Sequence, residues 1–260
     1  KVASFNVLNF FNGDGAGGGF PTSRGADTEN EFDRQSEKIF NAIQKLDADV
    51  LGLMELENDG FDDKSAINEL AKEINARSNS PDDVYAVVVP NGSLGGDQIA
   101  NGLIYRPAGV TMVGDPLTLT TGVFESRRPP IIASFKHNET GEEFTVSVNH
   151  FKSKGCRGAY GENENQNDGQ SCYAYERTQA AKELMAFLDT NPTGIKDSDY
   201  LVLGDLNSAS MEDPIQAFVE NGWVDLIDRE IGNENAATYV YRGFGSVLDH
   251  MLATPSLADN

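Results

Sequence analysis

Short apolar runs rich in β-forming residues alternate with amphipathic stretches along the whole chain, and this alternation constrains the fold most strongly. Amphipathic helices are predicted at residues 29–46, 67–74, 174–188 and 214–221. Strands are predicted at residues 1–7, 50–54, 84–89, 102–105, 110–113, 130–135, 144–148, 200–203 and 246–253. No internal repeat and no long linker divides the sequence. The pattern predicts one mixed α+β domain over residues 1–260, in which helices cover packed sheets.

The apolar run 200–203 leads into the tetrapeptide Gly204-Asp205-Leu206-Asn207. We predict a buried strand that the glycine ends. At strand period two, the side chains of Asp205 and Asn207 leave the same face. A carboxylate and an amide held side by side can handle a nucleophilic water and a developing oxyanion. The alternative is an Asx turn that merely stops the strand, and similar residues elsewhere favour the chemical interpretation.

Polar side chains also lie at or within the ends of four further predicted strands. These residues are Asn6, Glu55, Asn149-His150 and Asp249. A charged or amide group inside an apolar strand is unfavourable unless it is paired or ligated. One such residue is usually a satisfied structural group, but several that converge from separate strands indicate an active site.

The types of donor indicate a hard divalent cation. Carboxylate and amide oxygens suit Mg²⁺, Mn²⁺ or Ca²⁺. The chain has three histidines, without an HxxxH pair and without cysteines at ligand spacing, so zinc lacks ligands. No Gly-x-Ser-x-Gly elbow is present, and water is therefore the expected nucleophile. A Ca²⁺ site at Glu162, Glu164 and Asp168 is an alternative to a solvated acidic loop, which is favoured.

The charge balance argues against a general nucleic-acid coat protein. Acidic residues number 41 and basic residues 20, a net charge of −21, which repels polyanions at long range. Such a surface suits an exported protein in a salty medium, where screening limits the repulsion to about 8 Å. No apolar run is long enough for a membrane-spanning helix.

Two cysteines, Cys156 and Cys172, bracket a polar segment rich in Gly, Asn, Glu and Gln. A disulfide that closes this loop explains both, with a stabilisation of roughly 3 kcal/mol in the chain-entropy model. It favours an oxidising compartment and hence a secreted or surface protein. Two free thiols are the alternative.

Eight short motifs follow one another along almost the whole chain. They are Ser4-Phe5-Asn6-Val7-Leu8-Asn9-Phe10-Phe11, Glu31-Phe32-Asp33-Arg34-Gln35, Gly52-Leu53-Met54-Glu55-Leu56-Glu57-Asn58, Gly102-Leu103-Ile104-Tyr105-Arg106-Pro107, Arg127-Arg128-Pro129-Pro130, Asn149-His150-Phe151-Lys152-Ser153-Lys154-Gly155, Gly204-Asp205-Leu206-Asn207 and Leu248-Asp249-His250. In this order they resemble the endonuclease/exonuclease/phosphatase superfamily, which has the deoxyribonuclease-I-like fold. More narrowly, the chain resembles the secreted bacterial extracellular nucleases of that superfamily. The resemblance implies a four-layer α/β-β/α sandwich, in which two packed mixed β-sheets are flanked by helices.

The resemblance also implies a role for each matching residue. Glu55 would be the principal ligand of Mg²⁺ or Mn²⁺, with Asn6 beside it. Asp205 would orient or deprotonate the attacking water, and Asn207 would hold the phosphate. His150 would protonate or electrostatically support the phosphoryl group. These roles match a simple physical requirement, since attack on an anionic phosphodiester needs charge neutralisation and an acid–base pair.

Further residues would contact the substrate or orient the catalytic groups. Arg128 would contact phosphate, with Arg127 as its structural neighbour. Asn9, Lys152 and Lys154 would touch the flanking phosphate backbone, although lysines in a polar loop are more often solvated. Asp97 is a weaker candidate for orienting a histidine.

The end of the chain departs from the superfamily pattern. The superfamily closes with a Ser-Asp-His motif whose histidine is hydrogen-bonded by the aspartate that matches Asp249, and no such motif follows here. His250 is no substitute, because neighbouring side chains in a strand point to opposite faces. We expect a domain truncated at its C-terminus, without its last strand and its second catalytic histidine, and with greatly reduced activity.

Three functions follow from these observations. The leading one is a secreted, metal-dependent nuclease acting on DNA, with RNA as a further substrate and with no membrane or obligate protein partner. A phosphatase or phospholipase of the same fold, acting on a small or lipid phosphoester, is the first alternative. The second is a non-catalytic acidic extracellular binding module.

Overall fold

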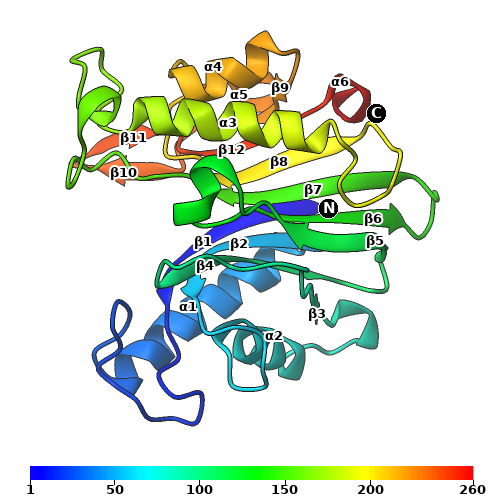
Figure 1. Cartoon of the computed structure of the whole chain (residues 1–260). Coiled ribbons are helices and arrows are strands. Elements are labelled where there is room, and N and C mark those ends of the chain that lie inside the picture. The colour runs from blue at the N-terminus through cyan, green and yellow to red at the C-terminus, as the bar shows by residue number, and fades with distance from the viewer. Residues whose placement is uncertain (260) are drawn as a thin grey trace.

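The computed structural model describes residues 1–259 and has four layers, with two β-sheets packed face to face between two layers of helices (Figure 1). The four-stranded sheet has the order β1 (Val2–Phe10), β2 (Val50–Glu57), β4 (Ile99–Tyr105) and β3 (Ala86–Val87). The six-stranded sheet has the order β5 (Val110–Thr118), β6 (Ile131–His137), β7 (Glu143–His150), β8 (Tyr200–Asp205), β12 (Asp249–Ala253) and β9 (Val224–Asp225). Both sheets are mixed, since β1 and β2 pair in parallel, as do β7 and β8, among antiparallel neighbours. The predicted α+β sandwich is confirmed.

Helices cover both outer faces. α1 (Glu29–Leu46) and α2 (Ala66–Ala76) lie on the four-stranded sheet, and α3 (Ala174–Leu188) and α4 (Asp213–Glu220) lie on the six-stranded sheet (Figure 1). The remaining helices are short: α5 (Leu226–Ile231), α6 (Pro255–Ala258), and the 3₁₀ turns η1 (Pro81–Asp83), η2 (Gly122–Ser126) and η3 (Gly161–Asn163). Among residues 1–259, no helix combines the length and the apolar character that crossing a bilayer requires.

Three apolar layers hold the four structural layers together. The first packs α1 and α2 against β1, β2 and β4, and the second packs α3 and α4 against the outer face of the six-stranded sheet. The third lies between the sheets and includes Met54, Val148 and Leu203. Because alternate residues of a strand face opposite layers, the burial pattern shows which way each side chain at a strand end points.

Several predicted boundaries are confirmed and others are wrong. The helices at 29–46 and 174–188 coincide with α1 and α3. The predicted strand at 246–253 is two elements, β11 (Phe244–Ser246) and β12, and β11 pairs with the unpredicted strand β10 (Tyr239–Tyr241). The predicted strand at 84–89 shrinks to the two residues of β3.

Gly204 lies within β8, so the prediction that this glycine ends the strand is wrong. Its φ is +126°, and a Cβ there would stand 2.1 Å from the carbonyl oxygen of Asn149. The glycine therefore allows β7 and β8 to approach closely just before Asp205.

Candidate active site

Regular strand alternation brings three predicted residues to one end of the layer between the sheets. In β7, the side chains of Val146 and Val148 face this layer, so by alternation the side chain of His150 faces it too. In β8, Leu201 and Leu203 face the same layer, and so does Asp205. Strands β7 and β8 pair in parallel with His150 opposite Asp205. On the other edge of β8, β12 pairs antiparallel with Asp249 opposite Asp205.

Glu55 reaches the same place through a distortion of β2. Leu51 and Leu53 face the helices, and strict alternation would send Glu55 into that core as well. Instead Glu55 has a φ of +65°, and the register between β2 and β4 shifts between Leu53 and Leu56. This bulge returns Leu56 to the helix side and points the carboxylate of Glu55 toward the other sheet.

Asn6 links the carboxylates that the two sheets contribute. Its Nδ2 donates to Glu55 Oε1 at 3.1 Å and to Asp205 Oδ2 at 3.3 Å. The backbone N–H of Asn9 donates to Glu55 Oε2 at 3.1 Å. The amide oxygen of Asn6 accepts the N–H of Leu8 at 2.9 Å, so Asn6 acts here as a donor between carboxylates. Its predicted role as a metal ligand would require rotation of this amide.

The carboxylates repel one another in a buried setting. Burial, followed by the charge of Asp249, raises the pKa of Asp205 to about 7, although the N–H of Asn207 and the amide of Asn6 oppose the shift. Burial also raises the pKa of Asp249. Conversely, burial and then the nearby Arg128 hold the pKa of His150 well below its usual range, so the imidazole is neutral at neutral pH.

These groups fit a divalent cation. One ligand atom each from Glu55, His150 and Asp205 lies within 4.8 Å of the others. His150 Nε2 is 3.7 Å from Asp205 Oδ2 and 4.0 Å from Glu55 Oε1. Nδ1 of this histidine is buried without a hydrogen-bond partner within residues 1–259. The carboxylates offer hard oxygen donors, and a cation would relieve their mutual repulsion, which matches Mg²⁺ or Mn²⁺. The residues Glu162, Glu164 and Asp168 form no such group within the described chain.

Asn207 lies at the site, but not through strand geometry. β8 ends at Asp205, and Asn207 has a φ of +50°. Its N–H donates to Asp205 Oδ1 at 3.0 Å, which is an Asx turn, while its Nδ2 donates to the carbonyl of Phe151 at 3.1 Å. The prediction that Asp205 and Asn207 leave one face of a continuous strand is therefore wrong, and the local structure is the alternative, an Asx turn. The turn holds Asp205 in place.

Arg128 holds the end of β7 in place through hydrogen bonds to its backbone carbonyls. It is buried, and it donates to the carbonyls of His150 at 3.2 Å and Phe151 at 2.7 Å. Its Nη1 donates to Asp97 Oδ2 at 2.8 Å. The prediction that Asp97 orients a histidine is wrong, since its carboxylate binds Arg128 and also Arg24 at 3.3 Å. Phosphate contact by Arg128 stays a prediction.

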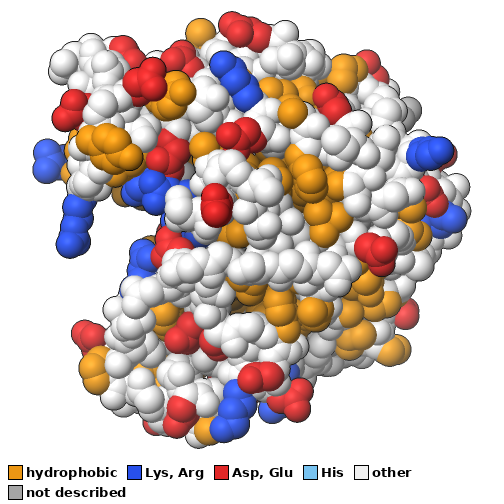
Figure 2. Space-filling view, in the orientation of Figure 1, with side chains coloured by type: hydrophobic (Ala, Val, Ile, Leu, Met, Phe, Trp, Pro, Cys, Tyr) orange, Lys and Arg blue, Asp and Glu red, His pale blue; other side chains and the backbone are white. Residues whose placement is uncertain are grey.

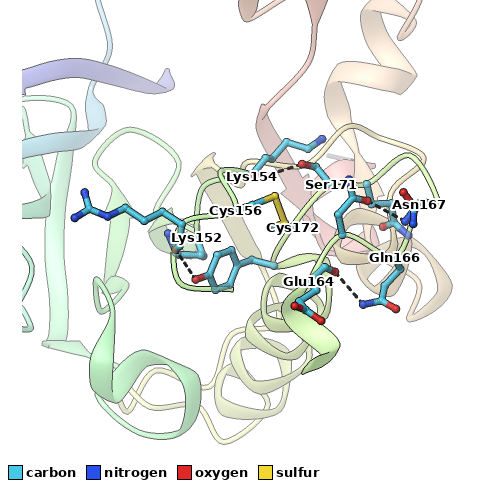
Figure 3. Close-up of a disulfide and its surroundings, with 12 residues drawn as sticks. Lys152, Lys154, Cys156, Glu164, Gln166, Asn167, Ser171 and Cys172 are labelled. Atoms are coloured by element: carbon cyan, nitrogen blue, oxygen red, sulfur yellow. Dashed lines mark hydrogen bonds between the residues drawn. A yellow bond between two sulfur atoms is a disulfide. The ribbon is translucent and has the colours of Figure 1, made fainter. Parts of the chain in front are cut away.

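The loop after β7 carries the predicted lysines and the disulfide. Cys156 and Cys172 are bonded, as predicted, and Figure 3 shows the bridge beside Lys154, whose carbonyl accepts the hydroxyl of Ser171 at 3.0 Å. Lys154 Nζ forms an ion pair with Glu212 and is therefore engaged within the protein. Lys152 Nζ lies 4.5 Å from the ring centroid of Tyr173. Burial, then the charge of Arg127, lowers the pKa of Lys152.

Arg177 joins the loops around the site, and the sequence interpretation missed it. It is fully buried in α3 and donates to Ser208 Oγ at 3.0 Å and to the carbonyl of Cys172 at 2.8 Å. It also donates to the carbonyls of Lys152 and Gln170. The available signal was a cation on the apolar face of a helix, because Arg177 lies three and four residues before buried alanines.

A groove of about 660 Å³ begins at Asn6 and Asn9 and runs between the end of β1 and the first half of α1. Its cationic lining, Arg24, Arg34 and Lys38, was also missed. Arg24 pairs with Asp97, whereas within residues 1–259 no ion pair engages Arg34 or Lys38. Figure 2 shows basic side chains on both sides of the notch at this end of the molecule, although the chain as a whole carries a net charge of −21.

The side chains of Asp249 and His250 point to opposite faces of β12, as predicted. Thr238 Oγ1 accepts the N–H of Asp249 at 3.1 Å. Met251 and Ala253 of β12 pack into the layer between the sheets, so strand alternation points the side chain of Asp249 to the same side. His250 is fully buried on the other side, with Nδ1 3.0 Å from Asp225 and Nε2 2.8 Å from the carbonyl of Ser208. His250 therefore has a structural role.

Comparisons with known proteins agree with this geometry. The family model described as the Endonuclease/Exonuclease/phosphatase family matches residues 3–259. A search among curated proteins finds no match.

Solved structures share the fold at low sequence identity. An endonuclease/exonuclease/phosphatase from Bacteroides vulgatus is 15% identical with a TM-score of 0.61, over 97% of this chain and 85% of that one. A mannosyl-6-phosphatase from Bacteroides thetaiotaomicron is 18% identical with a TM-score of 0.59, over 98% and 85%. A humanized D. rerio TDP2 is 15% identical with a TM-score of 0.58, over 96% and 81%. At these identities the likeness shows the fold alone.

Proposed function

This chain belongs to the endonuclease/exonuclease/phosphatase family, and we propose that within it the protein is a secreted, divalent-metal-dependent nuclease that hydrolyses phosphodiester bonds of DNA or RNA by an activated water. One observation carries the choice of a polymeric substrate. The groove beside the acidic cluster is lined by Arg24, Arg34 and Lys38, on a protein with twice as many acidic as basic residues. A phosphomonoester has no second phosphate to occupy such a groove, whereas a nucleic-acid strand does.

The residues at the cluster can share the chemistry among them. A divalent cation with Glu55 as its principal ligand would neutralise phosphate charge and align the nucleophile. Asp205, with a pKa of about 7, is matched to accept a proton from water at neutral pH. The neutral imidazole of His150 can donate a hydrogen bond to a phosphoryl oxygen. Asn207 and Arg128 hold the backbone that carries these two groups, through the carbonyl of Phe151.

The disulfide supports a secreted protein. Cys156 and Cys172 close an exposed loop directly after β7, and such bonds persist in oxidising compartments. The loop is flanked by Lys152 and Tyr173, and Lys152 Nζ lies 4.5 Å from the ring centroid of Tyr173. Lys152 and His150 line the same small cavity. Reduction of the bond should therefore loosen the chain beside His150.

The test compares two substrates. Nicking of a supercoiled plasmid in Mg²⁺ or Mn²⁺ is measured beside hydrolysis of p-nitrophenyl phosphate, with Asp205→Asn as the inactive reference. We expect metal-dependent nicking that Asp205→Asn and EDTA abolish, and much slower turnover of the monoester. Rapid monoester hydrolysis without nicking would identify a phosphatase instead. A protein that hydrolyses neither substrate, and no RNA strand either, would favour a binding module.

The groove is tested separately through its salt dependence. Arg34→Gln and Lys38→Gln should weaken DNA binding and each lower the slope of log affinity against log salt by about one. Lys45→Gln, an exposed lysine at the far end of α1, is the matched control. Equal slopes for all three variants would remove the groove from the proposal.

A further inference from the structure

The hairpin β10–β11 exposes three aromatic rings on one face. Tyr239 pairs directly with Ser246, and Tyr241 with Phe244, and residues directly opposite in an antiparallel pair share a face. Tyr239, Tyr241 and Phe244 therefore form one surface, while Val240 lies on the other. The rings of Tyr239 and Tyr241 are nearly parallel, with 11° between their planes and 6.4 Å between their centroids. We call these three residues the aromatic face.

The aromatic face lies outside the apolar core layers and is largely exposed. The exposed fractions of Tyr239, Tyr241 and Phe244 are 48%, 57% and 80%. None of the three belongs to an apolar core layer. Scattered apolar residues on a surface are ordinary, but adjoining exposed aromatic rings on one face indicate a binding surface.

The hairpin is attached to the candidate active site. Thr238, the residue before β10, accepts the backbone N–H groups of Leu248 at 2.9 Å and Asp249 at 3.1 Å through its hydroxyl. A cavity of about 390 Å³ is lined by Asn6, Thr238 and Asp249 and so connects the site with the base of the hairpin. Figure 1 shows β10 and β11 at the end of the sandwich that carries the site, and in Figure 2 apolar and basic side chains lie together over this hairpin.

A cation accompanies the rings. Arg242 lies in the turn of the hairpin with a φ of +51°, and its guanidinium carbon is 5.2 Å from the ring centroid of Tyr241. Parallel exposed rings with an adjacent arginine match a strand of nucleic acid, whose bases stack on aromatic faces while its phosphates bind the cation. A partner protein would gain from the apolar area but has no comparable use for parallel rings beside a cation and a phosphodiesterase cleft.

We propose that the aromatic face is a stacking platform for unpaired bases of the strand whose phosphate occupies the active site. This inference rests on the proposed nuclease function and specifies its substrate class. In a duplex both faces of an internal base are already stacked, so the platform can receive bases only from single strands or frayed ends. The enzyme should therefore bind single-stranded DNA or RNA more tightly than a duplex of equal length.

The test measures binding without catalysis. The full chain in EDTA is titrated with a fluorescent single-stranded oligonucleotide of about twelve nucleotides, within the usual site size, and with an abasic oligomer of the same length. Tyr239→Ala, Tyr241→Ala and Phe244→Ala should each weaken binding of the single strand by roughly tenfold and leave binding of the abasic oligomer unchanged. Val240→Ala, on the opposite face of the same hairpin and 66% exposed, is the matched control and should change neither.

Failure of this inference is distinguishable from failure of the proposed function. Plasmid nicking that depends on Asp205, together with ring variants that bind the single strand within twofold of the wild type, would overturn the platform alone. Binding that depends on the rings in a protein that cleaves neither DNA nor RNA would overturn the nuclease and retain the platform. Equal losses on the single strand and the abasic oligomer would contradict stacking. A dimer seen by sedimentation that Tyr241→Ala dissolves would assign the aromatic face to self-association and overturn the proposal.

Discussion

The two sheets supply the active site in different ways. The six-stranded sheet places His150, Asp205 and Asp249 by uninterrupted alternation along β7, β8 and β12. The four-stranded sheet must distort to place Glu55, which lies in a bulge at a φ of +65°. β1 is distorted beside it, with Leu8 at +53° and Asn9 at +50°, where the register shifts before Phe10.

The difference extends to the residue types. At the ends of β7, β8 and β12 beside the site, the positive φ angles fall on Gly204 and Asn207, which tolerate them. At the ends of β1 and β2 they fall on Leu8, Asn9 and Glu55, and for Leu8 and Glu55 the conformation is unfavourable by about 1–2 kcal/mol each. Among the strand ends at the site, backbone strain is therefore greater beside Glu55, as expected where a surrounding structure over-determines a functional group.

The largest expected effect tests whether both sheets serve one catalytic unit. Glu55→Gln and Asp205→Asn should each reduce plasmid nicking by at least about a thousandfold, because each removes a charge that the cation and the water need. The double variant should lose little more than either single variant, since the residues act together. Glu57→Gln, on the same strand, is the control, because glutamine can still accept the N–H of Asn12. Losses that multiply in the double variant would separate the two sheets functionally.

The same contrast explains what could be predicted from the sequence. The polar residues at strand ends and the family motifs predicted that His150, Asp205 and Asp249 converge, and regular strands bring them together because they obey period two. Glu55 was identified from its motif, but alternation alone would have buried it under α1 and α2. No glycine marks its bulge, so nothing local in the sequence predicts the change of direction.

The partners of the two buried arginines could not be predicted from the sequence for a related reason. Arg177 and Arg128 are buried by loops that come from distant parts of the chain, and their carbonyl partners carry no side-chain signal. The hairpin β10–β11 was missed because its turn contains Arg242 at a positive φ, without the usual Asn-Gly pair. Helices α1 and α3 were predicted with correct ends because their amphipathic pattern is local.

A second prediction concerns the close approach of β7 and β8. Gly204→Ala should destabilise the protein by about 5 kcal/mol, because a Cβ would meet the carbonyl of Asn149 and φ is +126°. Gly194→Ala, with a φ of +82° and open space around it, is the control and should lose only about 1 kcal/mol. Urea unfolding monitored by circular dichroism measures both. Similar losses would show that the regular sheet does not depend on this contact.

A third prediction uses the raised pKa of Asp205, which is caused first by burial and then by the charge of Asp249 in the same sheet. In metal-free protein the pKa of Asp205 is about 7 when folded, against a reference value of 3.8. The folded state therefore binds more protons between these values, and the free energy of unfolding falls as pH rises through this window, by up to about 4 kcal/mol. Asp205→Asn should flatten the dependence, and saturating Mg²⁺ should reduce it. A dependence that Asp205→Asn leaves unchanged would assign it to other groups.

The smallest expected effect tests the strain in β1. Leu8 has a φ of +53° and is 71% exposed, so glycine there would relieve the backbone without removing a buried side chain. Leu8→Gly should stabilise the protein by about 0.5 kcal/mol, the strain relieved less the entropy that glycine adds to the unfolded chain. Val89→Gly, at an exposed residue without a positive φ, should instead destabilise it by about as much. Because the N–H groups of Leu8 and Asn9 hold Asn6 and Glu55, nicking activity should fall in Leu8→Gly even as stability rises. A variant that gains stability and keeps full activity would show that the orientation of Asn6 and Glu55 does not depend on the strain in β1. The distortion required for function would then be confined to the bulge at Glu55.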